Sequence, residues 1–178
     1  MQLLLFFICA GKILVKFHFF SKMCARWTKK NNERYFGHKN HVRQDAGSKL
    51  VVKYMVTDAS VDDSNVTDDL LDDKDKGEEF YAGSAYSGEP QEKIIAGKEM
   101  ISKVCEKGAR NHPLTEEQKA GNREKSGIRS RVEHISGFME MSMNEMYIQC
   151  IGIRRATAII GLMNLTCNMY RKIQLIPV

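Results

Sequence analysis

Apolar and polar positions divide the chain into alternating predicted elements. The runs at residues 34–45 and 50–57 are rich in Tyr, Val and Phe, and the short segment Ala46-Gly47-Ser48-Lys49 separates them. β-branched and aromatic side chains favour strands, and two such runs joined by a short Gly-containing turn are typical of a β-hairpin. We therefore predict a hairpin over residues 34–57.

The segment after the hairpin predicts a second group of elements. Residues 58–77 are acidic and turn-rich, and residues 78–82, Glu-Glu-Phe-Tyr-Ala, form a short strand candidate. Residues 93–108 predict a short helix that leads into another strand. Together with the helices expected further on, these strands predict a mixed α/β domain.

Two helices are predicted in the remaining part. Thr115-Glu116-Glu117-Gln118 follows Pro113 and has the T-x-x-Q form of a capping box, which predicts a helix that begins there and extends through residue 133. Residues 151–175 are strongly apolar, but their uninterrupted apolar length is short and two asparagines lie inside it. We therefore expect a buried helix rather than a membrane span, and no membrane partner.

Residues 1–25 form an atypical apolar leader. The apolar run from Leu3 to Ala10 is too short to cross a bilayer, and no charged side chain precedes it, so a secretory signal is not favoured. Residues 12–20 instead have the composition of a buried strand. We find no internal repeat, and a chain of 178 residues is long enough for one domain with a sizeable core.

Charge is unevenly distributed along the chain. The net charge of +5 is moderate, but the Lys and Arg residues between Lys22 and Lys53 are accompanied only by Glu33 and Asp45, whereas residues 58–79 are dominated by carboxylates. A basic surface of this kind can follow the phosphates of nucleic acid. The alternative is a solvated basic face with no partner.

The cysteines and histidines give no sign of a metal site. The five cysteines are scattered and never form a C-x-x-C pair, which indicates reduced thiols in a cytoplasmic protein rather than disulfides or a zinc cluster. His38 and His41 lie in an extended segment, where a spacing of three directs side chains to opposite faces. We therefore do not expect them to share a metal ion.

Several sequence blocks occur in an order and spacing that resemble a known family. The blocks are residues 25–42, 56–64, 81–86 ("YAGSAY"), 111–126, 129–144 ("RSRVEHISGFMEMSMN") and 160–175. They resemble the C-terminal part of the catalytic domain of bacterial insertion-sequence DDE transposases, in the group that includes insertion sequences four and five. The resemblance covers about residues 25–175 and implies a ribonuclease-H-like mixed sheet with flanking helices.

The resemblance also implies a catalytic triad of Asp, Asp and Glu that works with Mg²⁺ or Mn²⁺ on DNA. Metal-dependent transfer of a phosphodiester needs carboxylates from separate elements, because two ions must bracket the attacking and leaving oxygens. Glu133 is implied to be the third carboxylate and a metal ligand. Arg129 is the family's arginine four positions earlier, on the same helical face, where it can orient the carboxylate or contact a DNA phosphate.

The sequence departs from the family pattern at both aspartates. Gly83 in "YAGSAY" stands at the position of the second aspartate, and no Asp or Glu occurs between Met1 and Asn32, where the first is expected. Asp58, Asp62 and Asp63 could supply a substitute carboxylate, but metal sites constrain ligand geometry strictly, and we prefer a solvated loop for this segment.

The resemblance implies a fold truncated at its N-terminal first strand, which in ribonuclease-H-like sheets lies between the second and fourth strands. Residues 26–178 are then the C-terminal part of the catalytic domain. Unpaired strand edges invite aggregation, and we hypothesise that residues 12–20 fill part of the vacancy as a surrogate strand. The competing account is a frameshifted leader with no evolved fit.

We expect a transposase fragment that is defective in DNA cleavage and that retains electrostatic binding of DNA. The alternatives are a non-catalytic fragment that binds DNA or inhibits a full-length transposase, and a nonfunctional product. Its expected partners are DNA and either a second copy or a full-length transposase. The residues predicted to bind DNA are Lys29, Lys30, Lys39, Arg43, Arg129 and Arg131.

Overall fold

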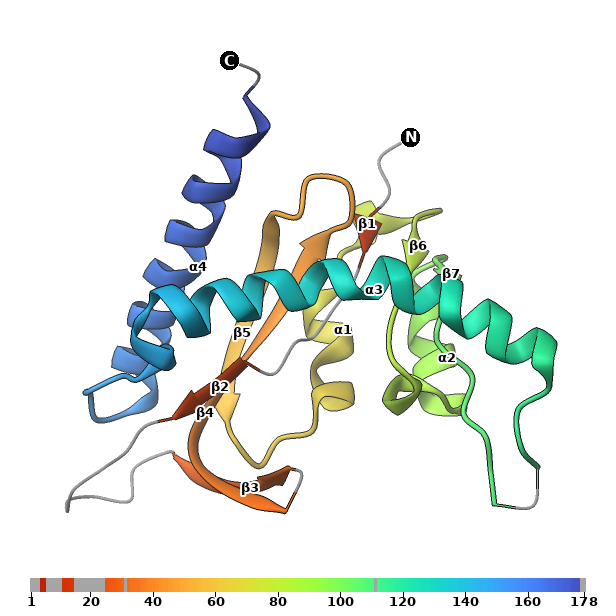
Figure 1. Ribbon diagram of the computed structural model, residues 1–178, viewed down its shortest axis with the longest axis horizontal. Helices are drawn as coiled ribbons and strands as arrows, with labels where there is room; N and C mark the ends of the chain where they lie inside the picture. Colours follow the sequence, from red (N-terminus) through yellow and green to blue (C-terminus); the bar gives the residue numbers. More distant parts are fainter. Residues whose placement is uncertain (1–3, 6–10, 15–24, 31, 111, 177–178) are drawn as a thin grey trace.

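A computed structural model describes residues 4–5, 11–14, 25–30, 32–110 and 112–176 (Figure 1). Its strands form a five-stranded sheet and a separate two-stranded sheet, and helices pack on and beside them. The fold is therefore mixed α/β, as the sequence predicted.

The predicted hairpin consists of strands β4 (Glu33–Asp45) and β5 (Val51–Asp58), which pair antiparallel. At the turn, the backbone N–H of Lys49 donates to the carbonyl of Asp45 at 2.9 Å, and the Asp45 carboxylate accepts from the backbone N–H of Ser48 at 2.6 Å. Lys49 adopts a positive φ of 62°, which lets the chain reverse. The hairpin prediction is confirmed.

Strand β4 lies at the centre of the larger sheet. Residues 38–40 of β4 pair with β2 (Gly11–Leu14) and with β5 at the same time, so these two strands occupy opposite edges of β4. Strand β1 (Leu4–Leu5) pairs further along at residues 44–45, and β3 (Arg26–Lys30) pairs at residues 33–37. All of these pairings are antiparallel.

Part of the apolar leader therefore pairs with the central strand β4. Residues 11–14 contain the first three residues of the proposed surrogate strand and lie in β2, whereas residues 15–20 lie outside the described part of the chain. Strand β1 also contacts β6 of the second sheet, and Figure 1 shows it between the hairpin and that sheet.

The second sheet consists of β6 (Glu79–Phe80) and β7 (Ile101–Ser102), which pair parallel. Parallel neighbours need a crossover connection, and helix α2 (Glu89–Gly97) lies within it, after a 3-10 turn at Ser84–Tyr86. The predicted order of strand, short helix and strand is confirmed.

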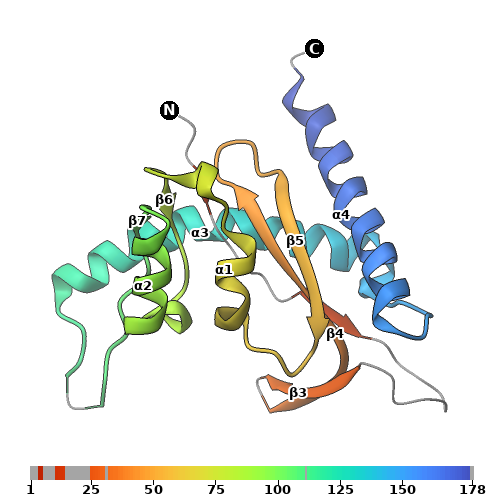
Figure 2. The same ribbon diagram turned by 180° about the vertical axis from the view of Figure 1, so that it is seen from behind.

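The acidic segment is more ordered than expected. Figure 2 shows α1 between the hairpin and α2. Leu70 and Asp75 are 2% exposed, so the expectation of a solvated loop is wrong for this part. The segment consists of a 3-10 turn at Asp63–Val66, helix α1 at Thr67–Leu70 and a 3-10 turn at Asp73–Asp75.

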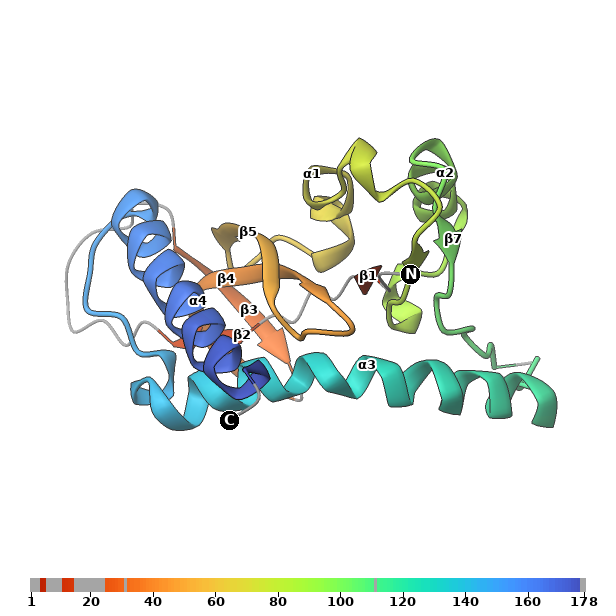
Figure 3. The ribbon, with the colours of Figure 1, turned by 90° about the horizontal axis from the view of Figure 1, so that it is seen from above.

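Helix α3 (Glu116–Ser142) begins at the predicted capping box. The Thr115 hydroxyl accepts from the backbone N–H of Gln118 at 3.2 Å, and the Gln118 side chain accepts from the backbone N–H of Thr115 at 2.9 Å. These two bonds satisfy donors that the first helical turn leaves unpaired. Figure 3 shows α3 running along one side of the molecule past both sheets, and a 3-10 turn at Asn144–Met146 follows it.

Helix α4 (Ile153–Leu175) buries one face on the hairpin. Both of its interior asparagines are satisfied: the Asn164 side chain donates to and accepts from the Asn40 side chain, at 3.3 and 2.9 Å, and Asn168 bonds the backbone of Val51 twice at 2.8 Å. The helix that the sequence predicted as buried is buried on this face alone, because Leu162, on the other face, is 63% exposed.

Two apolar clusters hold the elements together. The first joins the hairpin to α3 and α4 and contains Val42, Ile135 and Ile160, whereas the second joins β6, α2 and the β7 region around Phe80 and Ile95. Burial of apolar area is the main force that stabilises such contacts.

Candidate functional site

Gly83 lies just after strand β6 and caps the 3-10 turn at Ser84–Tyr86. Its φ of −73° and ψ of 168° are extended values that any residue adopts. The backbone therefore does not require glycine at this position, and the space around the missing side chain is what distinguishes it.

That space is occupied by Arg129. A Cβ built on Gly83 would lie 2.8 Å from Arg129 Nη1 and 3.9 Å from Arg129 Cζ, and apart from its two chain neighbours it would have no other contact within 4 Å among the described residues. The guanidinium thus lies where a side chain at position 83 would begin.

Contacts near the start of α3 hold this helix beside the second sheet. The Lys125 ammonium donates to the carbonyl of Val104 at 3.0 Å, and the Asn122 side chain exchanges two bonds of 2.9 Å with the backbone of Glu106. Val104 and Glu106 both lie in the segment that follows β7. Because these bonds fix α3 against that segment, Arg129 is carried past the end of β6.

Arg129 also reaches Glu133 on the same helix. Arg129 Nη2 lies 3.7 Å from Glu133 Oε1, a contact between residues four apart, and the two side chains are 37% and 65% exposed. Gly83, Arg129 and Glu133, which the sequence placed in one site, therefore form a connected row at the surface, with the arginine in the middle.

This donor set does not fit a pair of divalent ions. Mg²⁺ prefers several oxygen ligands, whereas the row offers one carboxylate and a guanidinium that repels a cation. Among the residues that the structure describes, no three His, Cys, Asp or Glu side chains come together as a possible metal site. Asp63, one of the candidate substitutes, instead lies 3.2 Å from His41 Nδ1.

The residues predicted to bind DNA divide into two groups. Lys29 and Arg131 are exposed, Arg129 is partly exposed, and Arg131 makes one long bond of 3.4 Å to the carbonyl of Ala46. Lys30 ends strand β3. Exposed cations on β3 and α3 are available to phosphates.

Arg43 does not belong to that surface, and its prediction as a DNA ligand is corrected. Its side chain is 4% exposed and pairs with the carboxylates of Asp72, at 2.7 Å, and Asp75. Arg43 also donates to the carbonyl of Leu70 at 3.3 Å. A buried guanidinium held by two carboxylates cannot turn to a phosphate without leaving them unpaired.

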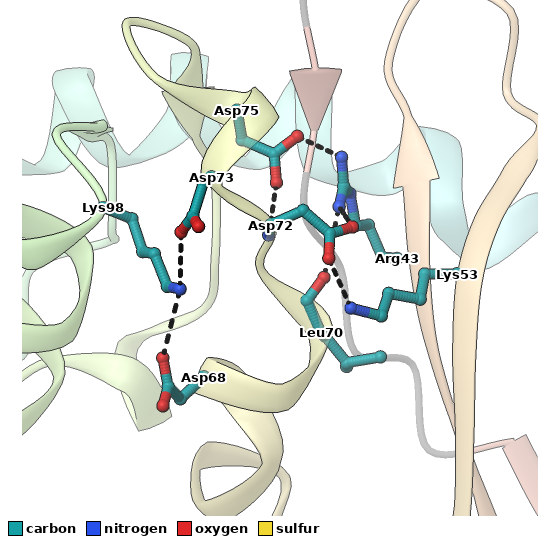
Figure 4. A network of polar contacts seen from close by, with 8 residues as sticks. All are labelled: Arg43, Lys53, Asp68, Leu70, Asp72, Asp73, Asp75 and Lys98. Atoms are coloured by element: carbon teal, nitrogen blue, oxygen red, sulfur yellow. Dashed lines mark hydrogen bonds and ion pairs between the residues drawn. The ribbon is translucent and has the colours of Figure 1, made fainter.

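Figure 4 shows the network around this pair. Asp72 and Asp75 converge on Arg43 from the acidic segment, and Lys53 of β5 contacts Asp72 at 2.6 Å. Lys98 closes the other side of the segment through Asp73 at 3.0 Å. The acidic segment is therefore tied to the hairpin by ion pairs.

Lys39 is also engaged within the protein. Its ammonium donates to the carbonyl of Val61 at 2.6 Å and lies 3.6 Å from Asp63 Oδ1, with 15% of the side chain exposed. Lys39 is therefore less available to DNA than the sequence predicted, because carboxylates later in the chain fold back onto strand β4.

The two central carboxylates of the network have opposite pKa shifts. The hydrogen bond from Lys53 holds the pKa of Asp72 below its usual value, with the charge of Arg43 adding to the effect. Burial raises the pKa of Asp75 even though Arg43 pairs with it. Desolvation therefore outweighs the ion pair at Asp75, whereas the more exposed Asp72 is governed by its cationic neighbours.

Trp27 and Arg34, which are exposed on β3 and β4, were not among the predicted site residues. One feature of the sequence could have indicated them: an aromatic residue, Trp27, stands inside a basic segment for which no apolar face was predicted.

Comparisons with known proteins agree with the sequence blocks. The transposase DDE domain family matches residues 16–169. The chain is 29% identical over 134 residues to the transposase for insertion sequence element IS1106 of Neisseria meningitidis serogroup B. This match covers 75% of the chain and 46% of that relative, so the chain spans about half the relative's length.

No solved structure matches the chain. Within the described residues, none of the helices has the length and apolar character that crossing a membrane requires. The family match covers most of the chain and includes Gly83, Arg129 and Glu133. The chain belongs to the transposase DDE domain family.

Proposed function

We propose that this protein binds DNA through exposed cations and does not cleave it. The observation that carries the proposal is the position of Arg129, whose guanidinium occupies the space at Gly83 where the family resemblance implies a carboxylate. A site with one carboxylate and one guanidinium lacks the set of carboxylates that two divalent ions need for cleavage, whereas the guanidinium can donate to a phosphate.

We also propose that the fold is a ribonuclease-H-like arrangement. In this interpretation β4 and β5 correspond to the second and third strands, and the parallel pair β6 and β7 to the fourth and fifth. Support comes from β1 and β2, which pair with β4 on the edge opposite β5, and from the contact that β1 makes with β6. The leader, residues 1–25, would then supply a surrogate first strand through β1 and β2 to the catalytic-domain part, residues 26–178.

The Mg²⁺ or Mn²⁺ implied by the family would require ligands beyond Glu133. The carboxylate of Glu133 lies at the surface beside Arg129, and those of Asp63 and Asp72 pair within the protein. What the site's own residues can do is hold a phosphate: Arg129 donates to its oxygens, and Glu133 orients the guanidinium.

The binding experiment measures the affinity of the chain for a labelled duplex at several salt concentrations. Because released counterions drive the binding, the affinity should fall steeply as salt rises, by about one unit of logarithmic slope for each phosphate contact. An affinity that does not change with salt, or no binding at low salt, would contradict the proposal.

A second candidate function is inhibition of an intact transposase. The observation that favours it is a row of exposed apolar side chains on α4, which a protein partner could cover. The row contains Leu162, Leu165, Met169 and Ile173. Coexpression with an intact relative tests this candidate, since an unchanged transposition frequency would count against it.

A further inference from the structure

Four side chains share one face of the β3–β4 hairpin. Trp27 is paired with Phe36, and Lys29 is paired with Arg34. Residues two apart on a strand face the same side of the sheet, and so do their direct partners. One face of the β3–β4 pair therefore presents two aromatic rings followed by two cations. We call these four side chains, Trp27, Phe36, Lys29 and Arg34, the Trp27 platform.

Trp27 is the solvent-exposed member of the aromatic pair, whereas Phe36 is partly buried. Trp27 is 64% exposed, and its ring lies 5.2 Å from that of Phe36 at an interplanar angle of 50°. A large aromatic side chain gains most when it is buried, so a tryptophan with this exposure leaves substantial apolar area uncovered. Packing within the described structure therefore does not account for it.

A shallow depression lies beside Trp27. It has a volume of about 400 Å³ and is lined by Trp27, Thr28, Lys29 and Arg34. These described lining residues include two cations and no carboxylate. The ligand that matches them has a flat apolar part and negative charge within a few ångströms of it.

We propose that the Trp27 platform binds an unpaired base of a DNA strand. Trp27 stacks on the base, and Lys29 and Arg34 bind the phosphates on either side of it. Base–aromatic stacking requires no particular sequence, because every base has a π face. A fully paired duplex hides these faces, so the platform favours DNA with unpaired positions.

This inference rests on the proposed function, because it assumes that the chain binds DNA. It adds a preference that the exposed cations alone do not provide, since phosphates are present in paired and unpaired DNA alike.

The test uses the intrinsic fluorescence of the full chain, in which Trp27 is the sole tryptophan. The chain is titrated with a duplex, the same duplex carrying an internal bulge, a single strand, and that strand with its bases removed. Quenching by the bulged and single-stranded DNA, with little by the duplex or the abasic strand, is the expected result. Equal quenching by a mononucleotide at the same concentration would reassign the platform to free nucleotides and overturn the proposal.

Affinities of variants provide a second measurement. Trp27→Ala should weaken binding to the bulged duplex roughly tenfold and leave the plain duplex nearly unchanged, and Trp27→Phe should retain most of the preference. Tyr170→Ala is the matched control, since Tyr170 is also half exposed and stacks on a phenylalanine, Phe138, at 4.6 Å. This control should leave both affinities unchanged.

The outcomes separate the two proposals. If all DNAs bind with the expected salt dependence but the tryptophan signal and the Trp27→Ala affinities do not change, the platform is wrong and the proposed function stands. If no DNA binds at low salt, the proposed function fails and the platform fails with it.

Discussion

The guanidinium of Arg129 lies against Gly83, with Nη1 2.8 Å from the position of a Cβ on that glycine. The relationship joins the end of strand β6 to the middle of α3, and the same arginine reaches Glu133 at 3.7 Å. Two positions that the family resemblance assigns to metal ligands are therefore bridged by a cation.

A carboxylate at position 83 should pair with Arg129. Gly83→Asp is expected to fold, because the backbone there is extended and the nearest atom is the end of a flexible side chain. Its free energy of unfolding should exceed that of Gly83→Asn by about 0.2–1 kcal/mol, the usual value of an exposed ion pair. Denaturant titration of both variants measures the difference, and Arg129→Gln should abolish it.

Equal stability of the Asp and Asn variants would show that Arg129 does not occupy this space. Gly83→Asp alone should also remain unable to cleave DNA, since the first aspartate of the family is still missing. Strand cleavage by this variant would mean that the triad positions are misassigned.

Arg43 should be needed for stability rather than for DNA binding. Arg43→Met leaves Asp75 buried without its cation, which typically costs about 3–5 kcal/mol of unfolding free energy. The double variant Arg43→Met with Asp75→Asn should recover much of this loss, because no charge is then left buried and Asn can still accept from the Asp72 backbone N–H. If Arg43→Met kept full stability but lost DNA affinity, Arg43 would be a phosphate ligand after all.

The network should lose stability in acid through Asp72. The pKa of Asp72 in the folded protein lies below the ordinary value of 3.8, chiefly because of Lys53. Its ionised form therefore stabilises the fold above pH 3.8, and this contribution is lost as the pH falls through the lowered pKa. Asp72→Asn should cost about 1 kcal/mol or less at pH 7, since the side chain is 45% exposed.

Measurement of urea unfolding between pH 7 and pH 2.5 tests this expectation. The stabilities of Asp72→Asn and the unaltered chain should converge at the acid end. Asp75 has the opposite sign: burial raises its pKa, so its ionisation costs stability as the pH rises through that raised value. A difference that persisted unchanged to the lowest pH would contradict the assigned role of Asp72.

Exposed and engaged lysines should differ in their effect on DNA binding. Lys29→Gln should weaken binding to any duplex and lower the slope of log affinity against log salt by about one. Lys39→Gln is the matched control, because this ammonium is bound to Val61 and Asp63. It should change the salt slope little, and equal effects of the two variants on the slope would show that Lys39 is released to bind DNA.

The elements set by local chemistry could be predicted from the sequence. The hairpin at residues 34–57 depends on strand-forming residues and a short turn, and the start of α3 depends on Thr115 and Gln118, three residues apart. The order of strand, short helix and strand at residues 78–108 could also be predicted from the sequence.

The pairing of charges could not be predicted in the same way. Arg43 and Lys39 lie in a basic region of the sequence with few nearby carboxylates. Arg43 nevertheless pairs with Asp75, 32 positions later, and Lys39 with Asp63, 24 positions later. Such neutralisation depends on how the acidic segment folds back on β4. Likewise, only the packing of α3 beside β6 reveals that Arg129 fills the space at Gly83.

The most direct test of DNA binding without cleavage is a nicking assay on supercoiled plasmid. The chain is added at a concentration that saturates the plasmid, with Mg²⁺ or Mn²⁺, and the nicked fraction is followed over time beside the Glu133→Gln variant. We predict that the plasmid is bound and that nicking does not exceed that of the variant. Nicking by the unaltered chain that Glu133→Gln abolishes would contradict the account.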